Sequence, residues 1–383
     1  MVFASAMSGG AGAGGREGAF RGVLGESTGR VDLQGLRRLC GGGVPDAPAA
    51  LRAAAWKCLL GLLPPALGDW EGALAARRAQ YADYCREFIR VPGDAEGGAG
   101  AGVPPPPPRN GPLRGVPVED HPLGLGGAWA AHFGDNEVRD QIDRDVMRTH
   151  PDMHFFSGDG PEARRHRASL RRALFVYAKL NPGLRYVQGM NEVYAPLYWA
   201  FCKDGGGAGG VAGAGVGANG GTDAAHAEAD AFFCFVELMS EFRDYFCKQL
   251  DNSEVGVKAM LGALAQRLHE ADRELSNHLV LKLRIDAQIY AFRWITLLLT
   301  QEFLFPDLVR LWDTLLSDPG GRTDCLLRLC LAMLMHVREE LLAGDFAVCV
   351  KLLQRYPPGT DVCDLLRRAE ALRGLATPPG DAP

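Results

Sequence analysis

Two charged side chains stand three residues apart near the end of a predicted helix, in the segment QIDRDVMRTHPD (141–152). Residues with this spacing are neighbours on a helix surface, so Asp145 and Arg148 can pair. Arg148 lies about 120° around the helix axis from Ile142, which belongs to the apolar stripe. The guanidinium therefore points outward at the helix end that Pro151 enforces. From this segment alone the simplest interpretation is an ordinary surface ion pair, at a helix end where the helix dipole also favours a cation.

A second polar group follows in YVQGMNE (186–192). Gln188 falls in a connection after the helix break at Asn181-Pro182-Gly183 and before an apolar helix. A glutamine there can bond to backbone, and Gly189 can supply a positive φ. Asn191 is a plausible cap of the apolar helix.

The elements that must position these groups all read as helices. Apolar residues recur at three- and four-residue spacing, and no alternating run of β-branched residues bounded by turns is present. The sequence therefore predicts an all-α fold of helices irregular in length. The predicted helices cover residues 71–91, 135–149, 164–180, 228–249, 254–271, 287–300, 306–316, 323–342 and 346–355.

In the 135–149 helix, Asp135 or Asn136 is expected as the cap, and Val138, Ile142 and Val146 form the buried stripe.

Composition excludes several classes of protein. A net charge of −5 lacks the basic footprint of a nucleic-acid binder. Ten cysteines without a CxxC pair are typical of reduced, mostly buried thiols in an intracellular protein. The start of the chain lacks the features of a secretory signal. The uncharged run 205–222 is nearly all Gly and Ala, so it reads as an insertion and no transmembrane segment is expected. The sequence contains no glycine-rich phosphate-binding motif, so no bound nucleotide is expected.

Low-complexity segments set the expected domain limits. We expect a flexible N-terminal tail over 1–35, one domain over 36–357 and a C-terminal helix and tail over 358–383. Two flexible loops interrupt that domain, at about 93–117, which contains Pro104–Pro108, and at 204–225. The proline run reads as a stiff spacer more than as a ligand for an aromatic groove.

Taken together, IDRDVMR (142–148) and YVQGMNE (186–192) resemble the paired signatures of the TBC domain, found in GTPase-activating proteins of Rab-type small GTPases. Residues 36–64 are similar to the opening segment of that domain, and 292–313 resemble its third signature, with Trp294, Glu302, Trp312 and Asp313 in place. The resemblance covers about residues 36–356. Within the family, residues 120–146 and 186–199 look closest to one subfamily.

The resemblance implies an irregular multi-helix TBC domain that accelerates GTP hydrolysis by a GTP-bound Rab-family GTPase and so regulates vesicle trafficking. Arg148 matches the arginine finger, and Gln188 matches a glutamine finger that orients the attacking water. A guanidinium contacts two phosphate oxygens at once, and an amide accepts and donates together. Asp145 would hold the arginine or meet the GTPase surface.

Tyr186, Ile142 and Gly189 would fix the helix and the loop that present these groups. The protein would need no cofactor or metal of its own, because GTP and magnesium belong to the partner. It would be a GTPase activator with no independent hydrolase activity. It would be cytoplasmic and meet lipidated GTPases on cytoplasmic membrane faces. Met147 departs from relatives that often carry a second basic residue, which bears on partner choice.

Three alternatives stay open from the residues. The first is a catalytically silent Rab-binding scaffold. The second is a metal hydrolase that uses His150 and His154, although Pro151 breaks a helix between them. The third is a nucleic-acid or membrane-surface binder that uses a basic cluster: Arg164, Arg165, His166, Arg167, Arg171 and Arg172.

Overall fold

The computed structural model describes residues 13–89, 128–203, 223–243, 246 and 256–374. Within these residues the fold is all-α, as predicted; the one β contact is an isolated antiparallel bridge between Arg30 and Ala66. The chain divides into two compact units. Unit 1 comprises Met1–Arg77 with Glu192–Pro383, and unit 2 comprises Arg78–Asn191.

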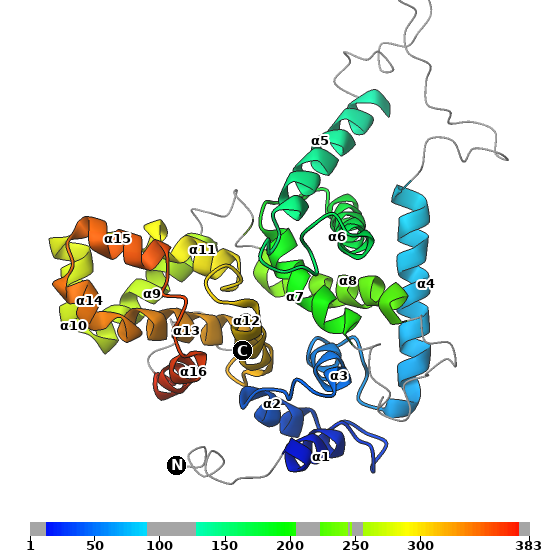
Figure 1. Cartoon of the computed structure of the whole chain (residues 1–383), viewed down its shortest axis with the longest axis horizontal. Helices are drawn as coiled ribbons and strands as arrows, with labels where there is room; N and C mark the ends of the chain where they lie inside the picture. The colour runs from blue at the N-terminus through cyan, green and yellow to red at the C-terminus, as the bar shows by residue number, and fades with distance from the viewer. Residues whose placement is uncertain (1–12, 90–127, 204–222, 244–245, 247–255, 375–383) are drawn as a thin grey trace, which may run out of the picture. The chain divides into compact units, whose positions relative to one another are not determined.

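Unit 2 is built on two helices that lie side by side, α5 (Ala128–Met147) and α6 (Pro161–Leu180) (Figure 1). It also holds most of α4 (Trp70–Phe88). Proline suits the first position of α6, where its missing N–H costs nothing. The predicted stripe of α5 is confirmed at Ile142 and Val146, which are 1% and 0% exposed. These apolar contacts fix the end of α5 that carries Arg148.

The predicted cap of α5 is wrong. The helix begins at Ala128, so Asp135 and Asn136 lie inside it. Both carboxylate oxygens of Asp135 instead accept from Lys179 Nζ at 2.9 Å. This ion pair joins α5 to α6, because the two residues face each other across the helix pair.

Unit 1 contains the remaining helices and starts α4, while α7 starts in unit 2. Their bounds are α1 (Ala13–Val23), α2 (Leu33–Gly41), α3 (Ala49–Leu59), η1 (Leu67–Asp69), α7 (Met190–Cys202), α8 (Asp223–Phe242), α9 (Val257–Ala271), α10 (Arg273–Ser276), η6 (Asn277–Lys282), η7 (Ala287–Ile289), α11 (Ala291–Thr296), α12 (Phe305–Ser317), α13 (Arg322–His336), α14 (Arg338–Ala343), α15 (Phe346–Gln354) and α16 (Val362–Ala371).

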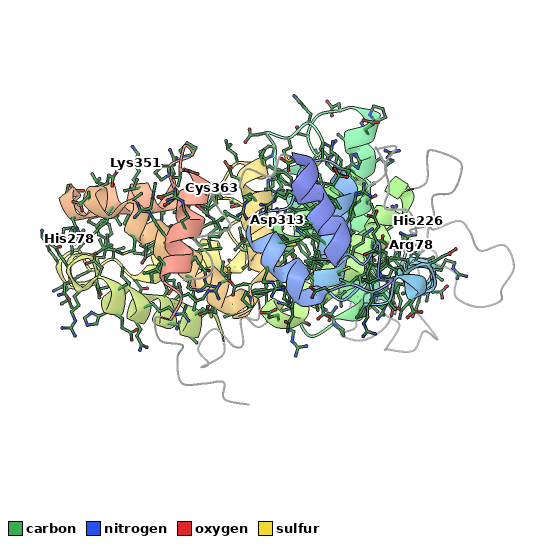
Figure 2. The ribbon with its side chains drawn as sticks, turned by 90° about the horizontal axis from the view of Figure 1, so that it is seen from below. Arg78, His226, His278, Asp313, Lys351 and Cys363 are labelled. Carbon is green, nitrogen blue, oxygen red and sulfur yellow. The ribbon has the colours of Figure 1, made fainter. Side chains whose placement is uncertain are left out.

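The core of unit 1 is held by residues of the third signature. Trp294 and Trp312 are completely buried, and Trp312 Nε1 donates to the carbonyl of Leu298 at 3.1 Å. Asp313 is also fully buried among the helices (Figure 2). Its carboxylate accepts from Arg52 Nε at 3.1 Å and from Trp56 Nε1 at 2.9 Å. The signature therefore ties α3 to α12 and acts as scaffold.

The expected tail over 1–35 is too long. Residues 13–23 form α1, in which Phe20 is fully buried, and Leu24 just after it is also buried. The predicted loop over 204–225 is shorter at its far end, because α8 begins at Asp223. The expected segments 93–117 and 205–222 lie outside the described residues. The C-terminal segment contains α16, as expected.

The cysteines behave as predicted where they are described. Cys40, Cys58, Cys234, Cys325, Cys330 and Cys349 are buried thiols, and each described cysteine is free of a disulfide. Burial raises the pKa of the Cys58 thiol to about 12, which makes it a poor nucleophile. No described helix is long and apolar enough to cross a lipid bilayer.

Candidate functional site

The end of α5 presents Arg148 to solvent. The helix stops at Met147, and the next two amides bond three residues back, Arg148 N to Asp145 O at 3.1 Å and Thr149 N to Val146 O at 3.3 Å. His150 then takes a positive φ of 40° before Pro151. The Arg148 side chain is 58% exposed. The prediction that it points away from the buried stripe is confirmed.

Asp145 holds this arginine from a buried position. Its side chain is 4% exposed, and Oδ1 accepts from Arg148 Nη2 at 2.6 Å. The other oxygen, Oδ2, accepts from the Tyr186 hydroxyl at 2.8 Å. One carboxylate thus bonds the helix-end arginine and the first residue of the 186–192 segment. The two segments that the sequence singled out meet at this carboxylate.

The loop after α6 carries Gln188 on the surface. After α6 ends at Leu180, Arg185 closes the next turn with a φ of 59° and donates its amide to the Asn181 carbonyl at 2.7 Å. Tyr186 is 5% exposed, whereas Gln188 two residues later is exposed. The Gln188 amide makes no hydrogen bond with any described residue. Gly189 has a φ of 103°, the positive value that the sequence suggested for it.

The structure therefore joins the two segments that carry the predicted site residues. Ile142 anchors α5, Asp145 and Tyr186 join the two segments, and Gly189 forms the turn. The two exposed candidates sit on either side of a buried hydrogen bond, Arg148 beside Asp145 and Gln188 two residues from Tyr186.

Sequence reasoning misassigned one residue and missed another. Helix α7 begins at Met190, so Asn191 lies within its first turn and does not cap it. Its side chain is 2% exposed and faces Thr149, which the sequence did not single out. A polar residue in the first turn of an otherwise apolar helix is a signal for such a contact, because a buried amide needs partners.

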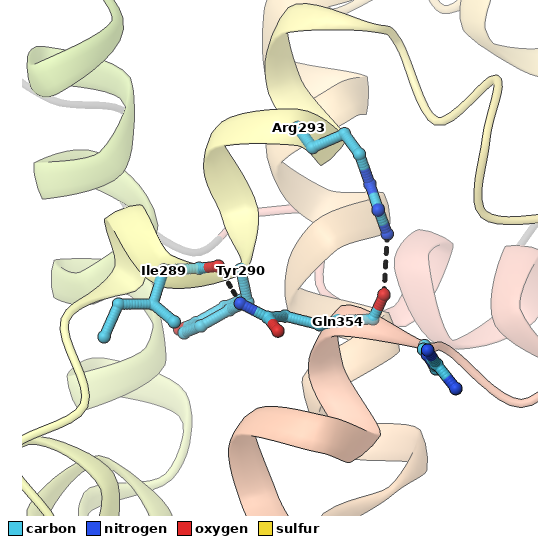
Figure 3. A pocket seen from close by; sticks show the side chains of 5 residues that line it. Ile289, Tyr290, Arg293 and Gln354 are labelled. Carbon is cyan, nitrogen blue, oxygen red and sulfur yellow. Dashed lines mark hydrogen bonds between the residues drawn. The ribbon is translucent and has the colours of Figure 1, made fainter.

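The candidate site is an open surface. One cavity of about 300 Å³ lies in unit 1 and is lined by Ile289, Tyr290, Arg293, Gln354 and Arg355 (Figure 3). Gln354 bridges it, since its Nε2 donates to the Ile289 carbonyl at 3.2 Å. This cavity contains none of the candidate residues. Arg148 and Gln188 are exposed, so both side chains are accessible to a molecule that docks from outside.

The basic cluster on α6 is largely committed to structure. Arg167 is buried and donates to the carbonyls of Phe156 at 2.7 Å and Gly158 at 2.8 Å. The His166 ring is buried and stacks on Phe155 with centroids 3.8 Å apart. These side chains cannot reach a phosphate backbone. The arrangement disfavours the nucleic-acid and membrane-surface alternative.

The two histidines of the metal alternative lie in different environments. His150 is half-buried, and desolvation lowers its pKa from 6.5 to about 4, opposed by Asp152. His154 is exposed. Across the described part of the chain, no cluster of His, Cys, Asp and Glu residues is suited to hold a metal ion. The geometry does not support a metal hydrolase.

Comparisons with known proteins agree with the fold and with the signatures. The family model described as "Rab-GTPase-TBC domain" matches residues 132–342. The chain is 38% identical to TBC1 domain family member 13 of Homo sapiens over 421 residues, which cover 92% of this chain and 96% of that protein. It is 25% identical to GTPase-activating protein gyp1 of Schizosaccharomyces pombe, over 85% of this chain and 54% of that one.

Among solved structures, the Ypt/Rab-GAP domain of Gyp1p shares the fold. The TM-score is 0.71 at 22% identity, with 93% of this chain and 96% of that chain covered. The RabGAP TBC domain from the Chlamydomonas flagellum aligns with a TM-score of 0.54 at 17% identity, over 87% and 82% of the two chains. The predicted subfamily likeness, to family member thirteen, is confirmed by the sequence match. The chain belongs to the Rab-GTPase-TBC domain family.

Proposed function

We propose that this protein accelerates GTP hydrolysis by a Rab-family small GTPase and supplies Arg148 and Gln188 in trans. The supporting observation is the exposed guanidinium of Arg148, held at 2.6 Å by a buried carboxylate that also binds the Gln188 loop through Tyr186. Such an arrangement presents one cation and one amide together on an open surface.

The two groups match the needs of phosphoryl transfer. Charge spreads over the phosphoryl oxygens in the transition state, and an arginine supplied in trans is worth roughly 10³–10⁵ in rate, or about 4–7 kcal/mol of barrier. The Gln188 amide accepts from the attacking water and donates to the terminal phosphate without any change of protonation. GTP and magnesium belong to the partner, so this chain contributes only side chains.

Asp145 has a positioning role in this proposal. Its carboxylate restrains the Arg148 guanidinium before the partner arrives, which limits the rotamer entropy lost on docking. Because the Arg148 side chain is 58% exposed, phosphate oxygens of a docked partner can reach its guanidinium beside Asp145 Oδ1. The partner's location implies that the protein acts at cytoplasmic membrane faces, in vesicle trafficking.

A panel of purified, GTP-loaded Rab proteins tests the proposal by single-turnover hydrolysis. The wild-type protein should accelerate at least one of them by about 10³-fold or more. Arg148→Ala should remove nearly all of this acceleration, and Gln188→Ala should lower the rate while binding to the same GTPase persists. Arg164→Ala, a change of another exposed arginine, is the matched control and should leave the rate unchanged.

The silent scaffold gives a different result. It predicts that a Rab protein binds with useful affinity while the wild-type chain accelerates hydrolysis by no member of the panel. Equal rates for the wild-type and Arg148→Ala proteins would also contradict the proposed use of this arginine.

A further inference from the structure

Asn191 contacts both segments of the candidate site with one side chain. On the loop side, its Oδ1 accepts from the Gly189 amide at 3.2 Å and lies 3.1 Å from the Tyr186 hydroxyl. On the helix side, its Nδ2 donates to Thr149 Oγ1 at 2.8 Å and to the Asp145 carbonyl at 3.3 Å. The Tyr186 hydroxyl gives its one proton to Asp145 Oδ2, so three of these four contacts are hydrogen bonds of the Asn191 amide, one through Oδ1 and two through Nδ2.

Burial makes the loss of any of these hydrogen bonds costly. Asn191 is 2% exposed and Thr149 is 1% exposed, so water does not replace a lost partner. A buried polar group left unpaired costs about 1–3 kcal/mol. The Thr149 hydroxyl completes the set, because it accepts from Asn191 and donates to the Asp145 carbonyl at 3.1 Å. The end of α5 and the 186–189 loop therefore move together or the hydrogen bonds break.

The sequence neighbours of these contacts are the two candidate fingers. Gln188 directly precedes Gly189, and Arg148 directly precedes Thr149. We propose that Asn191 is a positioning residue that sets the spacing between Arg148 and Gln188, an inference that rests on the proposed function. The Asn191 amide is buried. It acts through the backbone of the loop on one side and through Thr149 and the Asp145 carbonyl on the other.

A purely structural asparagine would behave differently from a positioning one. Loss of a structural contact lowers the free energy of unfolding and leaves the maximal rate of the folded protein intact. Loss of a positioning contact lowers the maximal rate of folded protein, since a displacement of about 1 Å can cost about 10²-fold. In a variant that already lacks Arg148, loss of the positioning contact should have little further effect on the rate, because mutations that act on the same site are not additive.

The experiment uses the full chain and the GTP-loaded Rab protein that responds best in the panel. Asn191→Ala should lower the maximal single-turnover rate about 10²-fold, with binding to a non-hydrolysable GTP form of the same GTPase changed less than threefold. In an Arg148→Ala background the same substitution should lower the remaining rate less than threefold. Denaturation curves establish that each variant is folded at the assay temperature.

Thr149→Val and Asn181→Ala complete the set. Thr149→Val breaks the helix side alone with little change of size, so it should lower the maximal rate in the same direction even if Asn191→Ala fails to fold. Asn181→Ala removes a half-buried amide of the same unit, whose Nδ2 donates to the Tyr177 carbonyl at 2.9 Å, and should leave the rate unchanged.

Three results would overturn the inference. These are a maximal rate above half of wild type for folded Asn191→Ala or Thr149→Val, a rate loss no larger than that of Asn181→Ala, or an undiminished effect in the Arg148→Ala background. If those occur while Arg148→Ala and Gln188→Ala are inactive, only the role of Asn191 fails. If Arg148→Ala and Gln188→Ala retain full activity, the proposed function fails and the role of Asn191 falls with it.

Discussion

Tyr186→Phe should weaken the junction of the site by a measurable amount. The substitution removes only the hydroxyl that donates to Asp145 Oδ2 at 2.8 Å. Hydrogen bonds to charged groups contribute about 1.5–3 kcal/mol, against about 0.5–1.5 kcal/mol for neutral pairs. Asp145 is 3% exposed, so water does not fully replace the lost donor. We expect a loss of about 2 kcal/mol, which is roughly 30-fold in the folding equilibrium constant.

Urea denaturation at neutral pH measures this loss, and Tyr356→Phe is the matched control. The Tyr356 hydroxyl is also buried but donates to a neutral acceptor, the Met333 carbonyl, at 3.1 Å. The control should therefore lose about 1 kcal/mol. A Tyr186→Phe loss below about 0.5 kcal/mol, or one no larger than the control's, would refute a charged hydrogen bond between Tyr186 and Asp145 in solution.

Three further changes test other parts of the structure. Among the described residues of unit 2, Met147 is the exposed large apolar side chain, at 58%. Met147→Ala should therefore raise KM about fivefold, because less apolar surface is buried against the partner, and should leave kcat within about twofold. Steady-state kinetics with the responsive Rab protein measures both, and an unchanged KM would exclude the contact. Asp313→Ala leaves the buried Arg52 without its Asp313 ion pair. Chemical denaturation should show a free energy of unfolding lowered by about 3–5 kcal/mol, and a loss below about 1 kcal/mol would contradict the buried pair. The folded protein keeps His150 neutral, because the pKa of this side chain is lowered from 6.5 to about 4. As pH falls through that window the unfolded chain takes up the proton first, so the folded protein loses stability. From pH 7 to pH 5 the free energy of unfolding of the wild-type protein should fall by about 2 kcal/mol more than that of His150→Gln, and parallel pH profiles would refute the shift.

Much of the fold could be predicted from local sequence. The apolar spacing of α5 and the Asn181-Pro182-Gly183 break depend on neighbours within a few residues, and both appear where expected. The outward direction of Arg148 follows from helix geometry alone. Gly189 takes a positive φ that its type favours over any other residue. These features need no knowledge of distant contacts.

The start of α5 and the extent of the N-terminal tail could not be read locally. Asp135 looked like a cap because a short polar side chain before an apolar run has that statistical role. Its carboxylate bonds Lys179 instead, from a helix whose approach no local pattern encodes. The sequence did not predict helix α1, because its Gly- and Ala-rich composition is typical of a flexible tail. The structure buries two apolar residues of this segment, Phe20 and Leu24.

The types of the candidate residues and their order were set by the sequence, since side-chain chemistry and helix periodicity are local properties. Their meeting was decided only by the tertiary structure. Asp145 and Tyr186 are distant along the chain, and their 2.8 Å hydrogen bond exists because α5 and the loop after α6 end at the same place. The role of Asn191 has the same origin, because a buried amide gains its meaning from the partners that packing brings to it.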